Sequence, residues 1–253
     1  MANDNQKKNN LPVVIIGVVL IVSAAVGLFW YNSAKPGTTG SNRQANNTQA
    51  KPTPVIAANA APGAVPPNST GSPTASVTVE EFADFQCPTC ATVHPMLSEV
   101  RSMYGNRIRF VFRNNPLAIP AHDKAYDAAV AAEAAGLQGK FWEMQNMLFQ
   151  NQQAWSANPG YKQIWADYAQ KLGLDVAKFQ NDVAGLGAKQ RVDEDLKRGR
   201  SLGVTGTPSI FINGVPVDTQ DFNVSGLKML IDRELAKTAA PAAPPANGAN
   251  TAK

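Results

Sequence analysis

The chain has 253 residues and a formal net charge of +4. Residues 75–237, however, hold 17 Lys and Arg against 18 Asp and Glu, a net charge of −1, so this segment lacks the basic surface that binds nucleic acid. We therefore expect no nucleic-acid partner. Two cysteines are also too few for a domain held together by a framework of disulfides.

The first part of the chain predicts a membrane anchor. Residues 11–31 are apolar and uncharged, and a helix needs about 20 such residues to span a bilayer. A secretory signal has a shorter apolar core of about 7–15 residues, so we expect an uncleaved signal anchor. A short N-terminus usually stays inside, which places residues 1–10 in the cytoplasm. The rest of this single-pass protein of the cytoplasmic membrane would then be extracytoplasmic.

Two segments have the composition of disordered chain. Residues 32–74 and 238–253 are rich in Pro, Ala, Asn, Ser and Thr, and such segments bury too little apolar surface to offset their conformational entropy. We expect the first to be a flexible linker and the second a tail. One domain, residues 75–237, remains between them.

The domain begins with a strand at 76–85, a helix at 88–104 that starts at Pro88 and contains Pro95, and a strand at 107–112. The helix between the two strands predicts that they are parallel. Only helical patterns follow, at about 122–137, 140–150, 161–172, 176–185 and 188–202. Asn213-Gly214 then predicts a hairpin between strands 208–212 and 215–217, with the second at the sheet edge because of Pro216, and a last helix covers 225–237.

The pair Cys87-x-x-Cys90 is the candidate for chemistry. It is either a redox pair or part of a metal site, for which the other soft ligands are His94 and His122, although a structural zinc site needs four ligands. Both histidines are more simply read as helix residues. At the helix start, Cys87 would face free backbone N–H groups, so we expect its pKa to lie well under 7. Cys90, one turn further on, should be more buried and act as the resolving thiol.

The predicted order is strand, helix, strand, five helices, hairpin and helix. This is an α/β, thioredoxin-like layout, with a central mixed sheet flanked by helices and an inserted all-helical subdomain at about 121–203. Residues 75–237 resemble the DsbA-like thiol:disulfide oxidoreductases of the thioredoxin superfamily, which are bacterial extracytoplasmic proteins. The motifs that carry the resemblance are Glu81-Phe82 before Cys87-Pro88-Thr89-Cys90, Arg113-Asn114-Asn115-Pro116-Leu117, Gly139-Lys140-Phe141-Trp142 and Gly203-Val204-Thr205-Gly206-Thr207-Pro208-Ser209.

The resemblance implies roles for further residues. Thr207-Pro208 should be a cis peptide beside the cysteines, where Thr207 would pair with an extended substrate next to Pro88 and Thr89. Glu81 would be a buried acid that exchanges a proton with Cys90.

The resemblance also implies a function: the Cys87–Cys90 disulfide, without another cofactor, is donated to cysteine-containing extracytoplasmic proteins and renewed by a quinone-linked membrane partner. A reductase or isomerase uses the same residues at a different redox potential. A metal-binding protein, such as a copper chaperone using the two cysteines, is the other alternative.

Overall fold

The computed structural model describes residues 60–239. The predicted cytoplasmic N-terminus, the anchor at 11–31, most of the linker and nearly all of the tail lie outside the described residues. No helix within residues 60–239 is long and apolar enough to cross a membrane.

A five-stranded mixed sheet lies at the centre of the described part, with the strand order β1-β3-β2-β4-β5. The strands are β1 (Asn68–Gly71), β2 (Thr78–Ala83), β3 (Arg109–Asn114), β4 (Ser209–Ile212) and β5 (Val215–Pro216). As predicted, β2 and β3 are parallel, and helix α2 (Pro88–Tyr104) connects them. The Asn213-Gly214 turn joins β4 to β5, which is an edge strand as Pro216 indicated.

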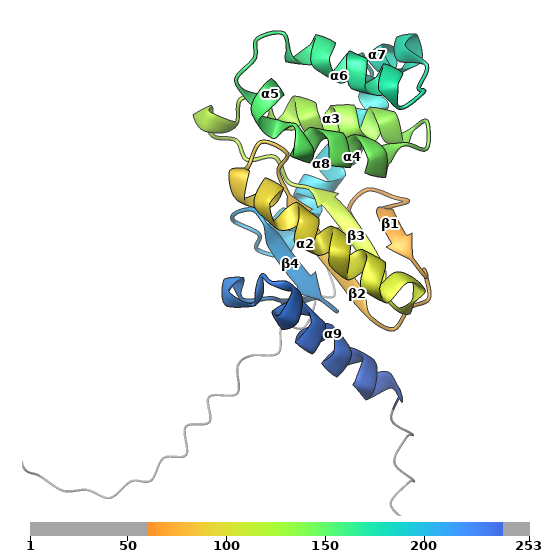
Figure 1. Cartoon of the computed structure of the whole chain (residues 1–253), viewed down its shortest axis with the longest axis vertical. Coiled ribbons are helices and arrows are strands. Elements are labelled where there is room, and N and C mark those ends of the chain that lie inside the picture. The colour runs from red at the N-terminus through yellow and green to blue at the C-terminus, as the bar shows by residue number, and fades with distance from the viewer. Residues whose placement is uncertain (1–59, 240–253) are drawn as a thin grey trace, which may run out of the picture. The chain divides into compact units, whose positions relative to one another are not determined.

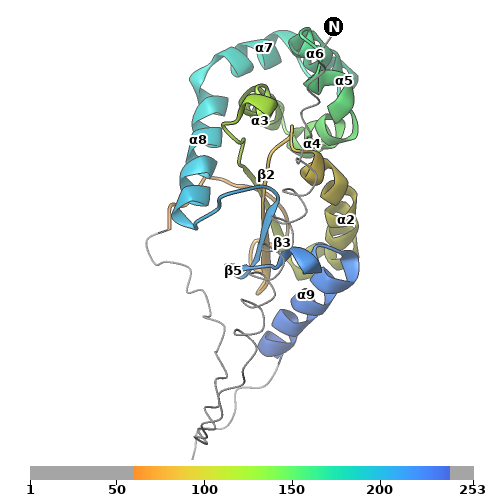
Figure 2. The same ribbon diagram turned by 90° about the vertical axis from the view of Figure 1, so that its left-hand side faces the viewer.

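The helical insertion between β3 and β4 is confirmed. It comprises α3 (Ala125–Gly136), α4 (Phe141–Gln150), α5 (Gln152–Ser156), α6 (Tyr161–Lys171), α7 (Val176–Ala184) and α8 (Leu186–Ser201). The sequence did not predict the short α5. It also placed His122 in a helix, whereas this histidine ends a 3₁₀ turn, Pro120–His122, that precedes α3. Figure 2 shows α8 on one side of the sheet, and α2 and the last helix α9 (Val224–Ala239) on the other.

Two apolar clusters form the core. In the first, β-strand residues such as Val79 and Phe110 pack with Leu97 of α2 and with Leu227 and Ile231 of α9. The alternation of side chains along a strand directs these residues to one face of the sheet.

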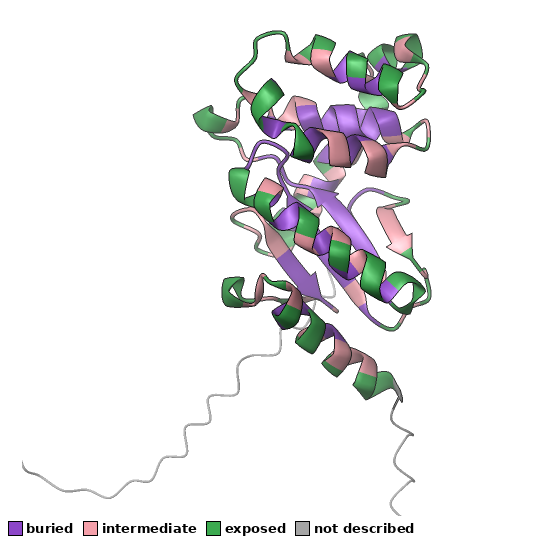
Figure 3. Cartoon of the chain, viewed as in Figure 1, coloured by how far each residue is buried: buried purple, intermediate pink, exposed green. Residues whose placement is uncertain are grey.

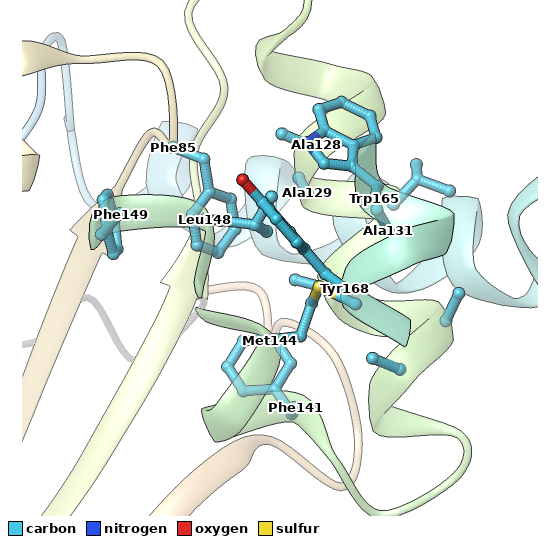
Figure 4. Packing of buried hydrophobic residues seen from close by; sticks show 14 of the residues in the cluster. Phe85, Ala128, Ala129, Ala131, Phe141, Met144, Leu148, Phe149, Trp165 and Tyr168 are labelled. Carbon is cyan, nitrogen blue, oxygen red and sulfur yellow. The ribbon is translucent and has the colours of Figure 1, made fainter. Parts of the chain in front are cut away.

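The second cluster lies in the insertion, where Met144 and Leu148 of α4 pack with Trp165 and Tyr168 of α6 (Figure 4). Alanines of α3 allow the neighbouring helices to approach closely, and α3 is largely buried (Figure 3).

The prediction of a disordered linker up to residue 74 was wrong at its C-terminal end. Residues 68–71 form β1, which pairs antiparallel with β3 (Figure 1). Upstream of β1, Arg113 donates hydrogen bonds to the carbonyls of Pro62 and Ala64, and Arg198 to that of Ala61. Composition did not reveal this order because groups far along the chain, rather than local apolar side chains, hold the segment in place.

Candidate active site

The two cysteines lie where β2 ends and α2 begins. Cys87 is the N-cap residue of α2, in extended conformation, and Pro88 occupies the first helical position as predicted. Cys87 is 6% exposed, whereas Cys90 is fully buried. Pro88 and Thr89 are exposed beside Cys87. Of the two cysteines, Cys87 is therefore the more accessible to solvent.

The loop before β4 supplies the second part of the site. The Thr207–Pro208 peptide bond is cis, as the resemblance implied. The Cys87 sulfur lies 3.5 Å from the carbonyl oxygen of Thr207, although 120 residues separate the two in the chain. The structure therefore brings together the C-x-x-C pair and the Thr207-Pro208 motif.

The two thiols have opposite acidities. The pKa of Cys87 is lowered to about 5, first by a hydrogen bond from the Cys90 thiol and then by the backbone N–H groups of Cys90 and Thr89. The backbone N–H groups at the start of the helix, on which the sequence-based prediction depended, do lower this pKa. The largest contribution, the hydrogen bond from the Cys90 thiol, was not predicted. At pH 7 a thiol of pKa 5 is about 99% thiolate. Burial, followed by the hydrogen bond to Cys87, raises the pKa of Cys90 far above its ordinary value.

Glu81 lies beneath the pair, on the face of β2 opposite its neighbour Glu80. Its side chain is fully buried, and its Oε1 has no hydrogen-bond partner within residues 60–239. Burial raises the pKa of Glu81 to about 8, against the opposing charge of Arg101. Because the charge of Glu81 also contributes to the raised pKa of Cys90, the two groups interact. A carboxyl with a pKa of about 8 is mostly neutral at pH 7.

The structure also shows site residues that the sequence did not indicate. The carboxylate of Asp84 accepts hydrogen bonds from the backbone N–H groups of Gln86 (2.6 Å) and Leu117 (2.8 Å). Its Oδ2 also lies 2.7 Å from Nδ1 of His122. The side chain of Gln86 in turn accepts a hydrogen bond from the backbone N–H of Lys124 (2.8 Å). These contacts hold the loop that leads to Cys87 against the start of the insertion. They could not be predicted from the sequence because the residues involved lie about 30 to 40 positions apart.

The side chain of His94 contacts residues of the helical insertion. Its Nε2 lies 2.8 Å from Oδ1 of Asn146, and its ring lies 4.8 Å from that of Phe149, centroid to centroid. Burial lowers the pKa of His94. Within the described part of the chain, no three His, Cys, Asp or Glu side chains gather as metal ligands.

Residues 64–233 match the family model described as Thioredoxin. The chain belongs to the thioredoxin family.

Solved structures of this family share the fold. BdbD from Bacillus subtilis superimposes with a TM-score of 0.58 at 22% identity, over 67% of this chain and 93% of that one. α-DsbA1 from Wolbachia pipientis gives a TM-score of 0.60 at 18% identity, over 68% and 92%. A thioredoxin-like oxidoreductase from Silicibacter pomeroyi gives 0.54 at 26% identity, over 69% and 94%. The described part of this thioredoxin-family protein therefore has the fold of DsbA-type oxidoreductases.

Curated relatives with a higher sequence identity than these solved structures are named as antiporters rather than oxidoreductases. The Na(+)/H(+) antiporter NhaA 1 of Mycolicibacterium gilvum is 38% identical over 146 residues, which are 57% of this chain and 23% of the antiporter. The NhaA 1 of Salinispora arenicola is 40% identical over 140 residues, 55% of this chain and 20% of that protein. The chain thus matches only about a fifth to a quarter of the length of these relatives.

Proposed function

We propose that this protein is a thiol:disulfide oxidoreductase that donates the Cys87–Cys90 disulfide to cysteine-containing proteins. The observation that carries the proposal is the pair itself. Cys87 keeps 6% exposure, has a lowered pKa and lies with its sulfur 3.5 Å from the Thr207 carbonyl oxygen, whereas Cys90 is fully buried and has a raised pKa. Perturbed acidities of this kind cluster at functional sites. Membership of the thioredoxin family and the DsbA-type fold support thiol–disulfide exchange as the chemistry.

In the proposed cycle, a substrate thiolate attacks the sulfur of Cys87. The Cys87–Cys90 bond breaks, and Cys90 leaves with the electron pair and takes a proton from Glu81. A second substrate thiolate then attacks the substrate sulfur of the mixed disulfide, and Cys87 leaves as its stable thiolate. The substrate dithiol loses two electrons to the protein and releases its two protons to solvent, from which Glu81 takes one back. The substrate becomes a disulfide, and the reduced protein holds Cys87 as a thiolate and Cys90 as a thiol.

The acidity of Cys87 favours donation over reduction. A stabilised thiolate lowers the free energy of the reduced protein and therefore makes its disulfide more oxidising. Thiols of thioredoxin type and DsbA type differ in this respect, with potentials of about −270 mV and about −120 mV. A Cys87 pKa of about 5 lies far below the ordinary thiol value, which supports a potential toward the oxidising end.

The reduction potential of the Cys87–Cys90 pair, measured against glutathione, tests whether the protein oxidises or reduces its substrates. A value near −120 mV, together with oxidative refolding of a reduced, unfolded disulfide protein, supports the proposal. Cys87→Ser should abolish the refolding activity. A value near −270 mV would overturn the oxidase direction and make the protein a reductase.

We further propose that the domain works on the outer side of the cytoplasmic membrane, tethered by residues 11–31, and that a quinone-linked membrane protein reoxidises it without any bound cofactor. The apolar stretch 11–31 supports a membrane anchor.

Relatives that are named as antiporters, a class of membrane transport protein, agree with a membrane location. Retention of the full chain in membranes after alkaline washing, and its loss on deletion of residues 1–59, would test the tether. Accumulation of the reduced form in membranes depleted of quinone would test the partner.

A further inference from the structure

Gln152 occupies a position that connects the insertion to the reactive cysteine. It is the first residue of α5, and its side chain is buried. Its amide nitrogen Nε2 donates two hydrogen bonds, one to the carbonyl of Phe85 (2.7 Å) and one to the carbonyl of Cys87 (2.9 Å). A single side-chain amide thus spans the backbone on both sides of Gln86.

Both acceptors matter for the geometry at sulfur. The Cys87 carbonyl also accepts the first hydrogen bond of α2, from the backbone N–H of Ala91 (3.2 Å). Gln152 therefore binds the peptide group at which the helix begins, while its second bond fixes the end of the preceding loop. The Cα of Cys87, which carries the sulfur, lies along the chain between these two fixed carbonyl groups, so the position of the sulfur relative to Cys90 and Thr207 depends on them.

We propose that Gln152 is a positioning residue of the redox centre, which holds the Cys87 backbone so that the sulfur keeps its position relative to the Cys90 groups and to the Thr207 carbonyl oxygen. This inference rests on the proposed function of the Cys87–Cys90 pair. Gln152 touches neither sulfur in the contacts described above, so it acts through the backbone of Cys87. It also gives the insertion a direct effect on the chemistry of the thioredoxin-like part.

The test compares Gln152→Leu with the wild type in the full-length chain, kept in detergent. Leucine has a similar volume but donates no hydrogen bond. The matched control is Gln170→Leu, the same change at an exposed position of α6. Two readouts are needed in each protein. One is the Cys87 pKa from the pH dependence of iodoacetamide alkylation, and the other is the equilibrium between the dithiol and glutathione at pH 7.

We expect Gln152→Leu to raise the Cys87 pKa by roughly one unit, the effect of weakening one or two hydrogen bonds to an ionised group. From a starting value of about 5, this change makes the disulfide roughly tenfold less oxidising at pH 7, or about 30 mV. Gln170→Leu should change neither quantity. A purely structural role would lower the unfolding midpoint of both redox forms equally and leave the pKa and the equilibrium constant unchanged.

Two results would overturn the inference. The first is a Gln152→Leu protein that folds, keeps the acid dissociation constant of Cys87 within about twofold of the wild type, and keeps the equilibrium constant with glutathione within the same range. The second needs no variant: if the Nε2 protons of wild-type Gln152 exchange with solvent freely and keep their NMR shifts when the pair is oxidised, they hold no such bonds. A wild-type Cys87 that titrates near 8.5 would instead contradict the proposed function. Failure of the Gln152 inference and failure of the proposed function therefore give different results.

Discussion

Glu81→Gln should change how the stability of the protein depends on pH. Burial raises the pKa of this carboxyl from 4.5 to about 8 in the folded protein. A raised pKa means that the folded state holds the proton while the unfolded state releases it. The stability of the wild type is therefore full below pH 4.5 and falls as the pH rises toward 8. At 1.36 kcal/mol per unit, the loss is about 3 kcal/mol at pH 7 and about 5 kcal/mol above pH 8.

Glutamine has the same shape as glutamate and does not titrate. Because the variant escapes this loss, it should gain on the wild type by about 3 kcal/mol between pH 4.5 and pH 7. Urea unfolding at half-unit pH intervals, on the oxidised form so that neither thiol titrates, measures the difference. Glu99→Gln, an exposed change on α2, serves as the control. Parallel stability curves for Glu81→Gln and the wild type would refute a raised pKa at this position.

Three further predictions concern the site and the segment before β1. Alkylation of Cys87 should be half-maximal near pH 5 and flat above pH 6.5, whereas a rate that still climbs at pH 8 would contradict a pKa of about 5. Arg113→Met should destabilise the fold by about 3–5 kcal/mol in urea, because it leaves the carboxylates of Glu80 and Asp195 buried without this partner. Exposed Arg200→Met should cost little. A chain that starts at residue 75 should unfold at a lower urea concentration than one that starts at residue 60, because it lacks β1, and equal midpoints would show that β1 contributes nothing.

Local signals predicted the parts of the fold that local physics determines. Pro88 at the first helical position placed Cys87 at the N-cap, and the structure has both there. Asn213 and Gly214 adopt the positive φ values, 49° and 77°, that a tight hairpin turn requires. The helix predicted at 176–185 is α7, and Asp175 caps it by accepting a hydrogen bond from the backbone N–H of Lys178 (2.9 Å). Each of these assignments depends on residues within a few positions of one another.

The missed features depend on contacts between distant residues. The backbone N–H of Ala64 donates to Asp195, 131 residues away, and Arg191 reaches the carbonyl of Pro66. Such pairs leave no periodic pattern, so the segment before residue 75 looked like linker. The network around Asp84 and the two bonds of Gln152 were invisible for the same reason. Residue types alone indicated which sulfur is reactive, but not which groups hold it.

In the proposed cycle, access to the two sulfurs and their leaving-group ability favour opposite points of attack. Attack at Cys87 expels Cys90, whose raised pKa makes it the poorer leaving group. Leaving-group ability alone would therefore favour attack at Cys90, but that sulfur is fully buried and out of reach of a substrate. Access thus selects the sulfur that is harder to attack. In the proposed cycle, Glu81, which burial keeps mostly neutral at pH 7, protonates Cys90 as it leaves and removes this penalty. Glu81→Gln should accordingly slow formation of the mixed disulfide, while the release of substrate from Cys87, which leaves as an already stable thiolate, should keep its rate.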